Sequence, residues 1–540
     1  MRERNELILS DLIALEAAQQ PGFDVLTFEH FSLDGGATPD EVRTYADLWR
    51  NGNRLATRLA ALGLRKGERF ALMMRNHPEF VEAMIAASLM GAVFVPIDPR
   101  TPAPRLAFML RDAACRGVVT ADYALPEVLA ARAEAPSVQW LLAIDSGEPG
   151  LAAVPNANGV ENIADGLAQD GPDFPAADVQ VGDPIQILYT SGTTGDPKGI
   201  VGDHRRLGST PYVAQLFGYQ ADERPYTGLS FTHNNAQTTA LLPALRFGYR
   251  AVISRRFTKS KLWDIARRYG CTSFAVLGGM ATAIYSEPAR ADDADNPVRL
   301  IISSGMPAVL WRAFEQRYKV ELFEIYGASD GGGMACNPPG QGPVGSFGKP
   351  VFGVQMKILD DDGNECAPGT VGEICCRPGD GSAASVQYHN NPDASRKKIV
   401  AGWNRSGDMG HRDAEGWLFY DYRKGGGIRR NGDFIDPSAV ERMIAEHPMV
   451  DDVYVYGVPA ASGAAGERDL VAALVPVDAE RFDAASVFAH CRAALEANAV
   501  PSWLQVLAEI PKTASEKPQE RFLLQDFSSG GAHLIAAARV

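Results

Sequence analysis

Up to about residue 350, short apolar runs alternate with segments whose apolar positions follow helical spacing. Residues 70–98, FALMMRNHPEFVEAMIAASLMGAVFVPID, hold two such runs around one helical segment, which predicts a strand, a helix and a strand. The further short runs RAVISRRF, TSFAVL, RLIISSG and VELFEIYG are also predicted strands. This alternation is typical of α/β layers with parallel strands, in which ligands collect in loops at the carboxyl ends of the strands.

From about Val351 the pattern changes to short alternating runs broken by Asp-Gly and Pro-Gly, which predicts antiparallel hairpins. A glycine triplet at residues 425–427 is a predicted hinge, because glycine tolerates the backbone angles that a hinge visits. The fold class we expect is therefore α/β. We expect a large N-terminal domain at 1–424, more β-rich and β-barrel-like from about 350, and a small mobile α+β domain at 428–540.

The composition limits the kinds of partner. With 46% hydrophobic and 22% charged residues and a formal net charge of -14, the chain looks globular and unsuited to nucleic acid or an anionic membrane surface. No apolar run of about 18 residues or signal peptide is visible, so we expect a cytoplasmic protein without a membrane span. The seven cysteines lack metal-like spacing. The sequence leaves open whether the chain forms a homodimer.

The stretch ILYTSGTTGDPKGIV at 187–201 has the composition of a phosphate-binding loop. Glycine N–H groups and hydroxyl donors can approach an anion here: Gly192, Gly195, Ser191, Thr193 and Thr194. Lys198 adds a mobile positive charge. The loop is not a Walker A sequence, because Pro197 precedes the lysine and Gly199 follows it.

YTSGTTGDPKG resembles the phosphate-binding signature of the adenylate-forming superfamily, which includes acyl-CoA ligases, peptide-synthetase adenylation domains and beetle luciferases. Other stretches resemble the remaining motifs of that superfamily, in the same order: SSGMP at 303–307, YGASD at 326–330, RSGDMG at 405–410, DYRKGGGIRRNGDFIDPSAVE and PKTASEKPQERFL. The resemblance covers both expected domains.

The resemblance implies a nucleotide site built from these motifs: Thr190, Ser191, Gly192, Thr193, Thr194, Gly195, Lys198, Gly305, Met306, Pro307, Tyr326, Gly327, Ser329, Asp408, Arg423 and Arg429. Tyr326 would stack on adenine and Asp408 would bind the ribose hydroxyls. Asp330 would help to hold Mg²⁺ through oxygen coordination.

The same resemblance implies the catalytic groups: Lys517, Ser329, Lys198 and His233. Lys517 would join the carboxylate and phosphate oxygens in the first half-reaction, and His233 would stand as a gate beside the carboxylate. Gly432 and Asp433 would lie on the coenzyme A side, on the face that the small domain presents after rotating about Gly425.

This chain departs from the superfamily pattern at several positions. Ser329 and Asp330 replace the usual Thr and Glu, Gly425 replaces an Asp or Lys at the pivot, and Glu516 replaces the glycine before the catalytic lysine. These departures are consistent with either tuned domain motion or weakened adenylation.

The chain ends shortly after Lys517, without a carrier domain, which favours a free-standing acyl-CoA ligase. Such an enzyme joins a carboxylic acid to ATP, giving acyl-AMP and pyrophosphate, and CoA then gives acyl-CoA and AMP. The resemblance also implies which segments form the walls of the acid pocket, and these are rich in Gly, Ala and Thr: HNNAQTTALLPAL, VLGGMATAIY and GASDGGGM. They favour a bulky apolar acid, such as a polycyclic terpenoid or steroid carboxylate or an aryl acid. A crotonobetaine/carnitine-type acid and a fatty acid remain alternatives.

Two alternatives belong to other classes. GASDG at 327–331 fits the nucleophile elbow of an α/β-hydrolase, with Ser329 as nucleophile and Asp408 and His411 as partners. The second alternative is a non-catalytic relative that binds nucleotide or acyl-adenylate as a sensor, supported by the altered positions Asp330 and Glu516.

Overall fold

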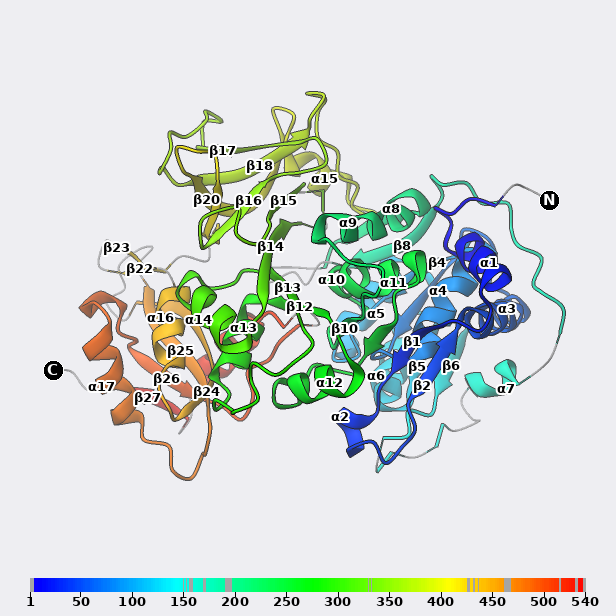
Figure 1. Ribbon diagram of the computed structural model, residues 1–540, viewed down its shortest axis with the longest axis horizontal. Coiled ribbons are helices and arrows are strands. Elements are labelled where there is room, and N and C mark those ends of the chain that lie inside the picture. Colours follow the sequence, from blue (N-terminus) through cyan, green and yellow to red (C-terminus); the bar gives the residue numbers. More distant parts are fainter. Residues whose placement is uncertain are drawn as a thin grey trace.

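The computed structural model describes residues 4–148, 150–151, 153–154, 159–168, 171–189, 197–328, 330–331, 333–424, 428–430, 433–435, 437–460, 468–513, 516–529 and 533–537. Figure 1 shows a large N-terminal part, a β-rich part at the top and a C-terminal part at the left. The expected hinge at 425–427 lies outside the described residues.

The largest sheet has 14 strands within the described part of the chain. In spatial order they are β17 (Val354–Leu359), β18 (Gly372–Pro378), β20 (Trp403–Arg412), β21 (Leu418–Arg423), β16 (Ser346–Pro350), β15 (Met334–Asn337), β14 (Glu321–Gly327), β13 (Leu300–Ser304), β12 (Ser273–Leu277), β10 (Pro225–Thr227), β11 (Ala251–Ile253), β1 (Asp24–Phe28) and β2 (Glu41–Thr44), with β19 (Ile399–Val400) beside β20. From β14 to β1 the neighbours pair in parallel, as the alternating pattern predicts. From β15 to β17 they pair antiparallel, so the expected β-rich part extends the same sheet.

A second sheet, with seven strands among the described residues, has the order β7 (Val160–Asn162), β6 (Trp140–Ile144), β5 (Cys115–Ala121), β3 (Arg69–Met73), β4 (Val93–Pro96), β8 (Pro184–Tyr189) and β9 (Gly199–Asp203). The predicted strand, helix and strand of residues 70–98 are present as β3, α4 (Pro78–Met90) and β4. Pro78 opens α4, and Gly91 closes it in the left-handed conformation at φ +64°. Because nearly every side chain of α4 is buried, the helix lies in the core.

The amphipathic helix α3 (Tyr45–Ala61) packs on α4. Its first turn is closed by a capping box between Thr44 and Asp47. The other helices of the N-terminal part are α1 (Leu9–Gln19), α2 (Phe31–Asp34), α5 (Ala103–Asp112), α6 (Leu125–Arg132), α7 (Ile163–Leu167), α8 (His204–Ser209), α9 (Val213–Phe217), α10 (Asn234–Ala236), α11 (Leu242–Phe247), α12 (Leu262–Tyr269), α13 (Gly278–Ser286), α14 (Ala308–Tyr318) and α15 (Pro392–Lys398).

The C-terminal part is a small α+β unit with its own apolar core. It contains β22 (Ile428–Arg430), β23 (Asp433–Ile435), α16 (Pro437–Ala445), β24 (Val450–Pro459), β25 (Arg468–Pro476), α17 (Ala484–Ala494), β26 (Trp503–Val506), α18 (Glu520–Ser529) and β27 (Leu534–Ala536). Helix α13 of the N-terminal part contacts α16 and β24, so the two parts pack together beside it (Figure 1).

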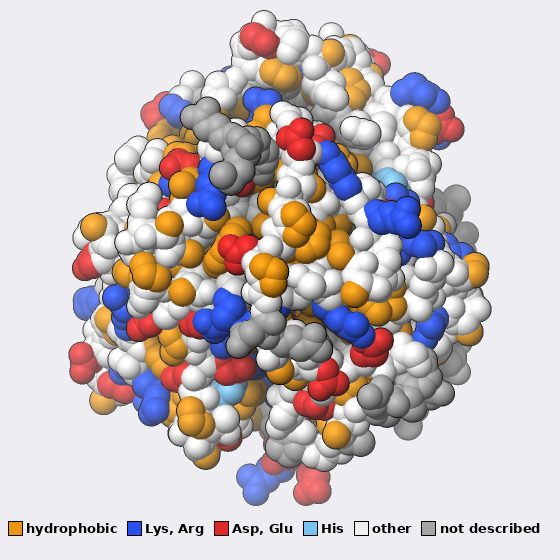
Figure 2. All heavy atoms as spheres, turned by 90° about the vertical axis from the view of Figure 1, so that its right-hand side faces the viewer, with side chains coloured by type: hydrophobic (Ala, Val, Ile, Leu, Met, Phe, Trp, Pro, Cys, Tyr) orange, Lys and Arg blue, Asp and Glu red, His pale blue; other side chains and the backbone are white. Residues whose placement is uncertain are grey.

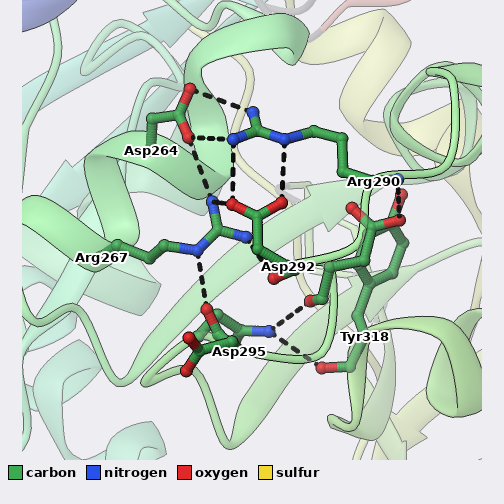
Figure 3. A network of polar contacts seen from close by, with 8 residues as sticks. Asp264, Arg267, Arg290, Asp292, Asp295 and Tyr318 are labelled. Atoms are coloured by element: carbon green, nitrogen blue, oxygen red, sulfur yellow. Dashed lines mark hydrogen bonds and ion pairs between the residues drawn. The ribbon is translucent and has the colours of Figure 1, made fainter.

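A polar network fixes the segment that follows α13 (Figure 3). Arg290 binds Asp264 of α12 and Asp292, and Arg267 of α12 binds Asp264, Asp292 and the Asp295 carbonyl oxygen. These pairs tie the segment that follows α13 to α12.

The surface view in Figure 2 faces the side of the molecule that carries α1 and α3. Basic and acidic side chains alternate on this face outside the grey atoms. No helix in the described part of the chain is long and apolar enough to cross a membrane.

Candidate active site

A cavity of about 2090 Å³ lies between the N-terminal and C-terminal parts. Each predicted site residue that is described in full lines it: Lys198, His233, Gly305, Met306, Pro307, Tyr326, Gly327, Asp330, Asp408, Arg423 and Lys517. Residues that are far apart in the sequence therefore meet at one place.

The ends of the parallel strands β13 and β14 line the cavity. The Glu324 carboxylate accepts hydrogen bonds from the backbone N–H groups of Gly305 and Met306 and so shapes the turn after β13. Burial raises the pKa of Glu324 to about 7. Glu324 was not among the predicted site residues; its only signal in the sequence is a carboxylate between the apolar residues Phe323 and Ile325.

Asp408 and Tyr326 form the expected ribose and adenine side of the site. The Tyr326 hydroxyl donates to Asp408 Oδ2 at 2.7 Å, and Arg423 Nη1 donates to Asp408 Oδ1 at 2.5 Å. The Tyr326 ring stacks on Phe347 with the centroids 4.6 Å apart. Asp408 and Arg423 are cross-strand neighbours on β20 and β21, so the sheet register brings this pair together.

Lys517 enters the cavity from the C-terminal part. Its backbone N–H donates to Thr513 Oγ1 at 3.2 Å, and its carbonyl oxygen accepts from the Thr513 N–H at 2.8 Å. Burial lowers the pKa of the Lys517 ammonium; Asp408 opposes this shift and Arg423 reinforces it. The charge of Lys517 therefore lies within electrostatic reach of the predicted ribose pair.

His233 also lines the cavity, within electrostatic reach of Lys517. Burial lowers the pKa of His233 to about 4, and the Lys517 charge adds to that shift. The imidazole is therefore neutral near pH 7 and adds no charge beside the lysine. Its Nδ1 accepts from the Asn235 N–H at 3.2 Å.

Asp330 is held by partners that the sequence analysis missed. Lys398 Nζ lies 2.8 Å from Asp330 Oδ2, and the Tyr388 hydroxyl donates to the same oxygen at 2.8 Å. Burial raises the pKa of the Asp330 carboxyl, but Lys398 and Tyr388 outweigh it, so the net shift is downward. Lys198 Nζ lies 5.4 Å from the centre of the Tyr388 ring, which places the predicted phosphate-loop lysine beside this cluster.

The Asp330 cluster fits Mg²⁺ bound together with ATP. Among the described residues, no group of three or more His, Cys, Asp or Glu side chains could hold a metal ion by itself. Mg²⁺ commonly binds through one or two carboxylates plus substrate phosphates and waters. The ionised Asp330 carboxylate supplies a donor of that kind.

The expected acid pocket is lined by the segment that follows His233 and by α13. The segment Gln237–Leu241 forms a π-helical turn, and α13 supplies Gly278, Gly279 and Thr282. The Thr238 hydroxyl is buried and has no hydrogen-bond partner within the described part of the chain. The wall at this end is thus made of small side chains with little charge.

Several predicted site residues lie outside the described residues: Thr190, Ser191, Gly192, Thr193, Thr194, Gly195, Ser329, Gly425 and Gly432. The side chains of Arg429 and Asp433 also lie outside the described part. Tyr189 and Lys198, on the two flanks of the phosphate loop, line the cavity.

Asp408 and His411, the residues considered as partners of a hydrolase nucleophile, are bound to other side chains. His411 Nδ1 lies 2.8 Å from Asp421 Oδ2, whereas Asp408 is bonded to Tyr326 and Arg423. Asp408 and His411 therefore do not form an acid–base pair, and the hydrolase alternative loses this support.

Comparison with protein-family models gives two matches. The model described as AMP-binding enzyme matches residues 14–384, and the model described as AMP-binding enzyme C-terminal domain matches residues 439–517.

Among curated proteins, the chain is 28% identical over 488 residues to a crotonobetaine/carnitine–CoA ligase of Proteus mirabilis, covering 89% of this chain and 92% of the relative. It is 27% identical over 481 residues to the ligase of the same name from Salmonella typhimurium, covering 88% and 91%.

Solved structures with the same fold include an anthranilate CoA ligase in complex with anthranoyl-AMP (TM-score 0.79, 24% identity, covering 96% of this chain and 97% of that chain). They also include the o-succinylbenzoate CoA synthetase of Bacillus subtilis with ATP and a magnesium ion (TM-score 0.74, 23% identity, covering 95% and 99%). The expected α/β fold with a smaller C-terminal domain is confirmed.

Proposed function

Because this chain belongs to the AMP-binding enzyme family, we propose that it is an acyl-CoA ligase for a bulky apolar or aryl carboxylic acid. The resemblance to adenylate-forming enzymes is confirmed, and so is the enzyme class, an AMP-forming acyl-CoA ligase that uses ATP, Mg²⁺ and coenzyme A. The identity of the acid and the role of each residue belong to the proposal.

The composition of the acid-pocket wall supports this choice of acid. The wall segments 233–239 and 277–283 contain no carboxylate and no Phe, Tyr or Trp; the imidazole of His233 is their one ring. A quaternary ammonium group, as in crotonobetaine or carnitine, is recognised by aromatic cages or by an opposite charge. An apolar acid needs only volume and apolar contact, which small side chains leave available.

In the first half-reaction, a carboxylate oxygen of the acid attacks the α-phosphorus of ATP. An O–P bond forms, the bond from the α-phosphorus to the bridging oxygen breaks, and pyrophosphate leaves with the electron pair. Lys517, which lines the cavity, would draw the two anionic groups together. Asp408 and Tyr326 would hold the nucleoside, and Mg²⁺, held in part by Asp330, would neutralise phosphate charge.

In the second half-reaction, the sulfur of coenzyme A attacks the acyl carbon after losing its proton. The C–O bond to AMP breaks and AMP leaves. Lys517 is not needed in this step, so we infer that the C-terminal part rotates about residues 425–427 and withdraws it.

The test is ATP–pyrophosphate exchange with Mg²⁺ over a panel of short-chain, betaine-type, aryl, fatty and polycyclic acids. Exchange is expected with aryl or polycyclic acids, and Lys517→Ala should lower it by about 100-fold or more. Lys357→Ala is the matched control, because Lys357 pairs with Glu365 on the surface and does not line the cavity. Adding coenzyme A to the active acid tests the thioester step.

The other outcomes separate the alternatives. Exchange with betaine-type acids alone would replace the apolar acid by the substrate class named for the curated relatives. Binding of ATP without exchange for any acid would favour the sensor.

A further inference from the structure

Within the described part of the chain, two sets of ion pairs join the C-terminal part to the N-terminal part. Lys259 Nζ, on the N-terminal side, lies 2.5 Å from Asp451 Oδ1. Arg100, in the loop after β4, makes the second contact with the segment that carries Lys517.

Arg100 contacts that segment at two points. Its Nη2 donates to the Thr513 carbonyl oxygen at 2.6 Å, and its Nη1 lies 3.6 Å from Glu516 Oε1. Thr513 is hydrogen-bonded to the backbone of Lys517, and Glu516 precedes that lysine directly. The Arg100 guanidinium therefore contacts both Thr513 and Glu516, the two residues that flank the turn before Lys517.

Asp98 orients the Arg100 guanidinium. Its Oδ1 accepts from Arg100 Nε at 3.2 Å, and its Oδ2 accepts from Arg100 Nη2 at 3.0 Å. Because the guanidinium is a planar fork, these two bonds fix the direction in which the remaining donors point.

The backbone conformation of Glu516 is an independent indication that the contact of its side chain with Arg100 is functional. Its φ is +56°, a conformation that favours glycine. A glutamate at this position bears backbone strain and gains the contact with Arg100. Burial raises the pKa of the Glu516 carboxyl, while Arg100 and Lys512 oppose that shift and favour the charged form.

We propose that Arg100, held by Asp98, is a positioning residue that keeps Lys517 in the active site during the first half-reaction and has no part in the second. This inference rests on the proposed function. The contact joins the two parts of the molecule, so it exists only in an orientation that brings Lys517 to the cavity. Its free energy therefore favours that orientation over any other.

The experiment measures the two half-reactions separately, using the full-length enzyme and its active acid. Acyl-AMP formation is followed by pyrophosphate exchange, and thioester formation is followed from preformed acyl-AMP and coenzyme A. For Arg100→Ala we expect acyl-AMP formation to fall roughly tenfold, the loss typical of a charged hydrogen bond with an added ion pair. Thioester formation should be unchanged or faster.

Three further variants sharpen the result. Glu516→Gly removes the ion pair and relieves the strained backbone, so it should slow only acyl-AMP formation, by less than Arg100→Ala. Arg100→Lys should recover part of the rate, since an ammonium keeps the charge but not the fork. Arg111→Ala is the matched control, because Arg111 is equally exposed (45% against 46%) and pairs with Glu134 within the N-terminal part.

Equal loss in both half-reactions of the folded Arg100→Ala enzyme, or no loss in either, would overturn the inference. If the unaltered enzyme gives no exchange with any acid, the proposed function itself fails, which is a different result. Thermal unfolding of each variant separates a positioning defect from a folding defect.

Discussion

At the scale of single residues, the buried Glu324 carboxyl makes stability depend on pH. Its pKa in the fold is about 7, above the usual value for Glu, so between about pH 4.5 and about pH 7 the folded state binds a proton that the unfolded state has lost. The free energy of unfolding therefore falls as the pH rises through this window. The contribution is up to about 3 kcal/mol.

Glu324→Gln should remove that fall, because an amide does not titrate. Urea unfolding at about pH 5 and about pH 8 measures the difference. Glu321→Gln, an exposed carboxyl on the same strand, is the control and should keep the pH dependence of the original protein. An unchanged slope for Glu324→Gln would contradict the prediction.

The hydroxyl of Tyr326 offers a second test at this scale. Tyr326→Phe keeps the ring that stacks on Phe347 but removes the donor to Asp408. The carboxylate loses one of its two fixed partners and becomes less well oriented for the ribose. We expect the KM for ATP to rise about fivefold with little change in kcat, as for the loss of one hydrogen bond. Steady-state kinetics with varied ATP measures this, and a change in kcat alone would oppose the assignment.

At the scale of elements, strand β16 depends on a close approach to β15. Gly348 has φ +101°, and a Cβ atom there would lie 1.7 Å from the Cys336 carbonyl oxygen. Gly348→Ala should therefore force the two strands apart and destabilise the fold by at least about 3 kcal/mol. Gly22→Ala, with no atom within 4 Å of its Cβ and no positive φ, should change little. Thermal unfolding of both variants checks this, and equal melting temperatures would be the contrary result.

The elements could be predicted where a local pattern determines them. The strand, helix and strand at 70–98 could be predicted from two short apolar runs on either side of a helical segment, and all three elements are almost entirely buried. The extension of the large sheet through β16 to β21 was less predictable, because alternating runs indicate hairpins but not the sheet that they join. The alternating runs had led us to expect a barrel-like part in this region.

The site could also be predicted only in part. Its motif residues on strand ends could be placed from the resemblance, and the cavity gathers those that are described. The partners of Asp330 could not be predicted, because Tyr388 and Lys398 lie far along the chain in a segment without a motif. Arg100 and Thr513 are 413 residues apart, and only the folded chain brings them together.

At the scale of the whole molecule, the proposed rotation can be arrested chemically. All seven cysteines are buried, so a short bismaleimide should react first with thiols introduced at the surface. Cross-linking Lys259→Cys to Asp451→Cys would hold the two parts in the described orientation. The cross-linked enzyme should still form acyl-AMP but should lose thioester formation.

The same double variant without cross-linker is the control and should retain both half-reactions. Rates of pyrophosphate exchange and acyl-CoA formation are compared before and after cross-linking. Thioester formation that survives complete cross-linking would show that this orientation serves both steps.

The burial of the cysteines also bears on chemical selectivity. An acyl-adenylate is a strong electrophile that acylates any thiolate within reach. None of the seven cysteines lines the cavity, and burial raises the pKa of several, to about 11 for Cys375 and Cys491 and about 12 for Cys115. These thiols stay protonated and poorly nucleophilic near neutral pH. The enzyme's own thiols therefore compete little with the sulfur of coenzyme A for the activated acyl group.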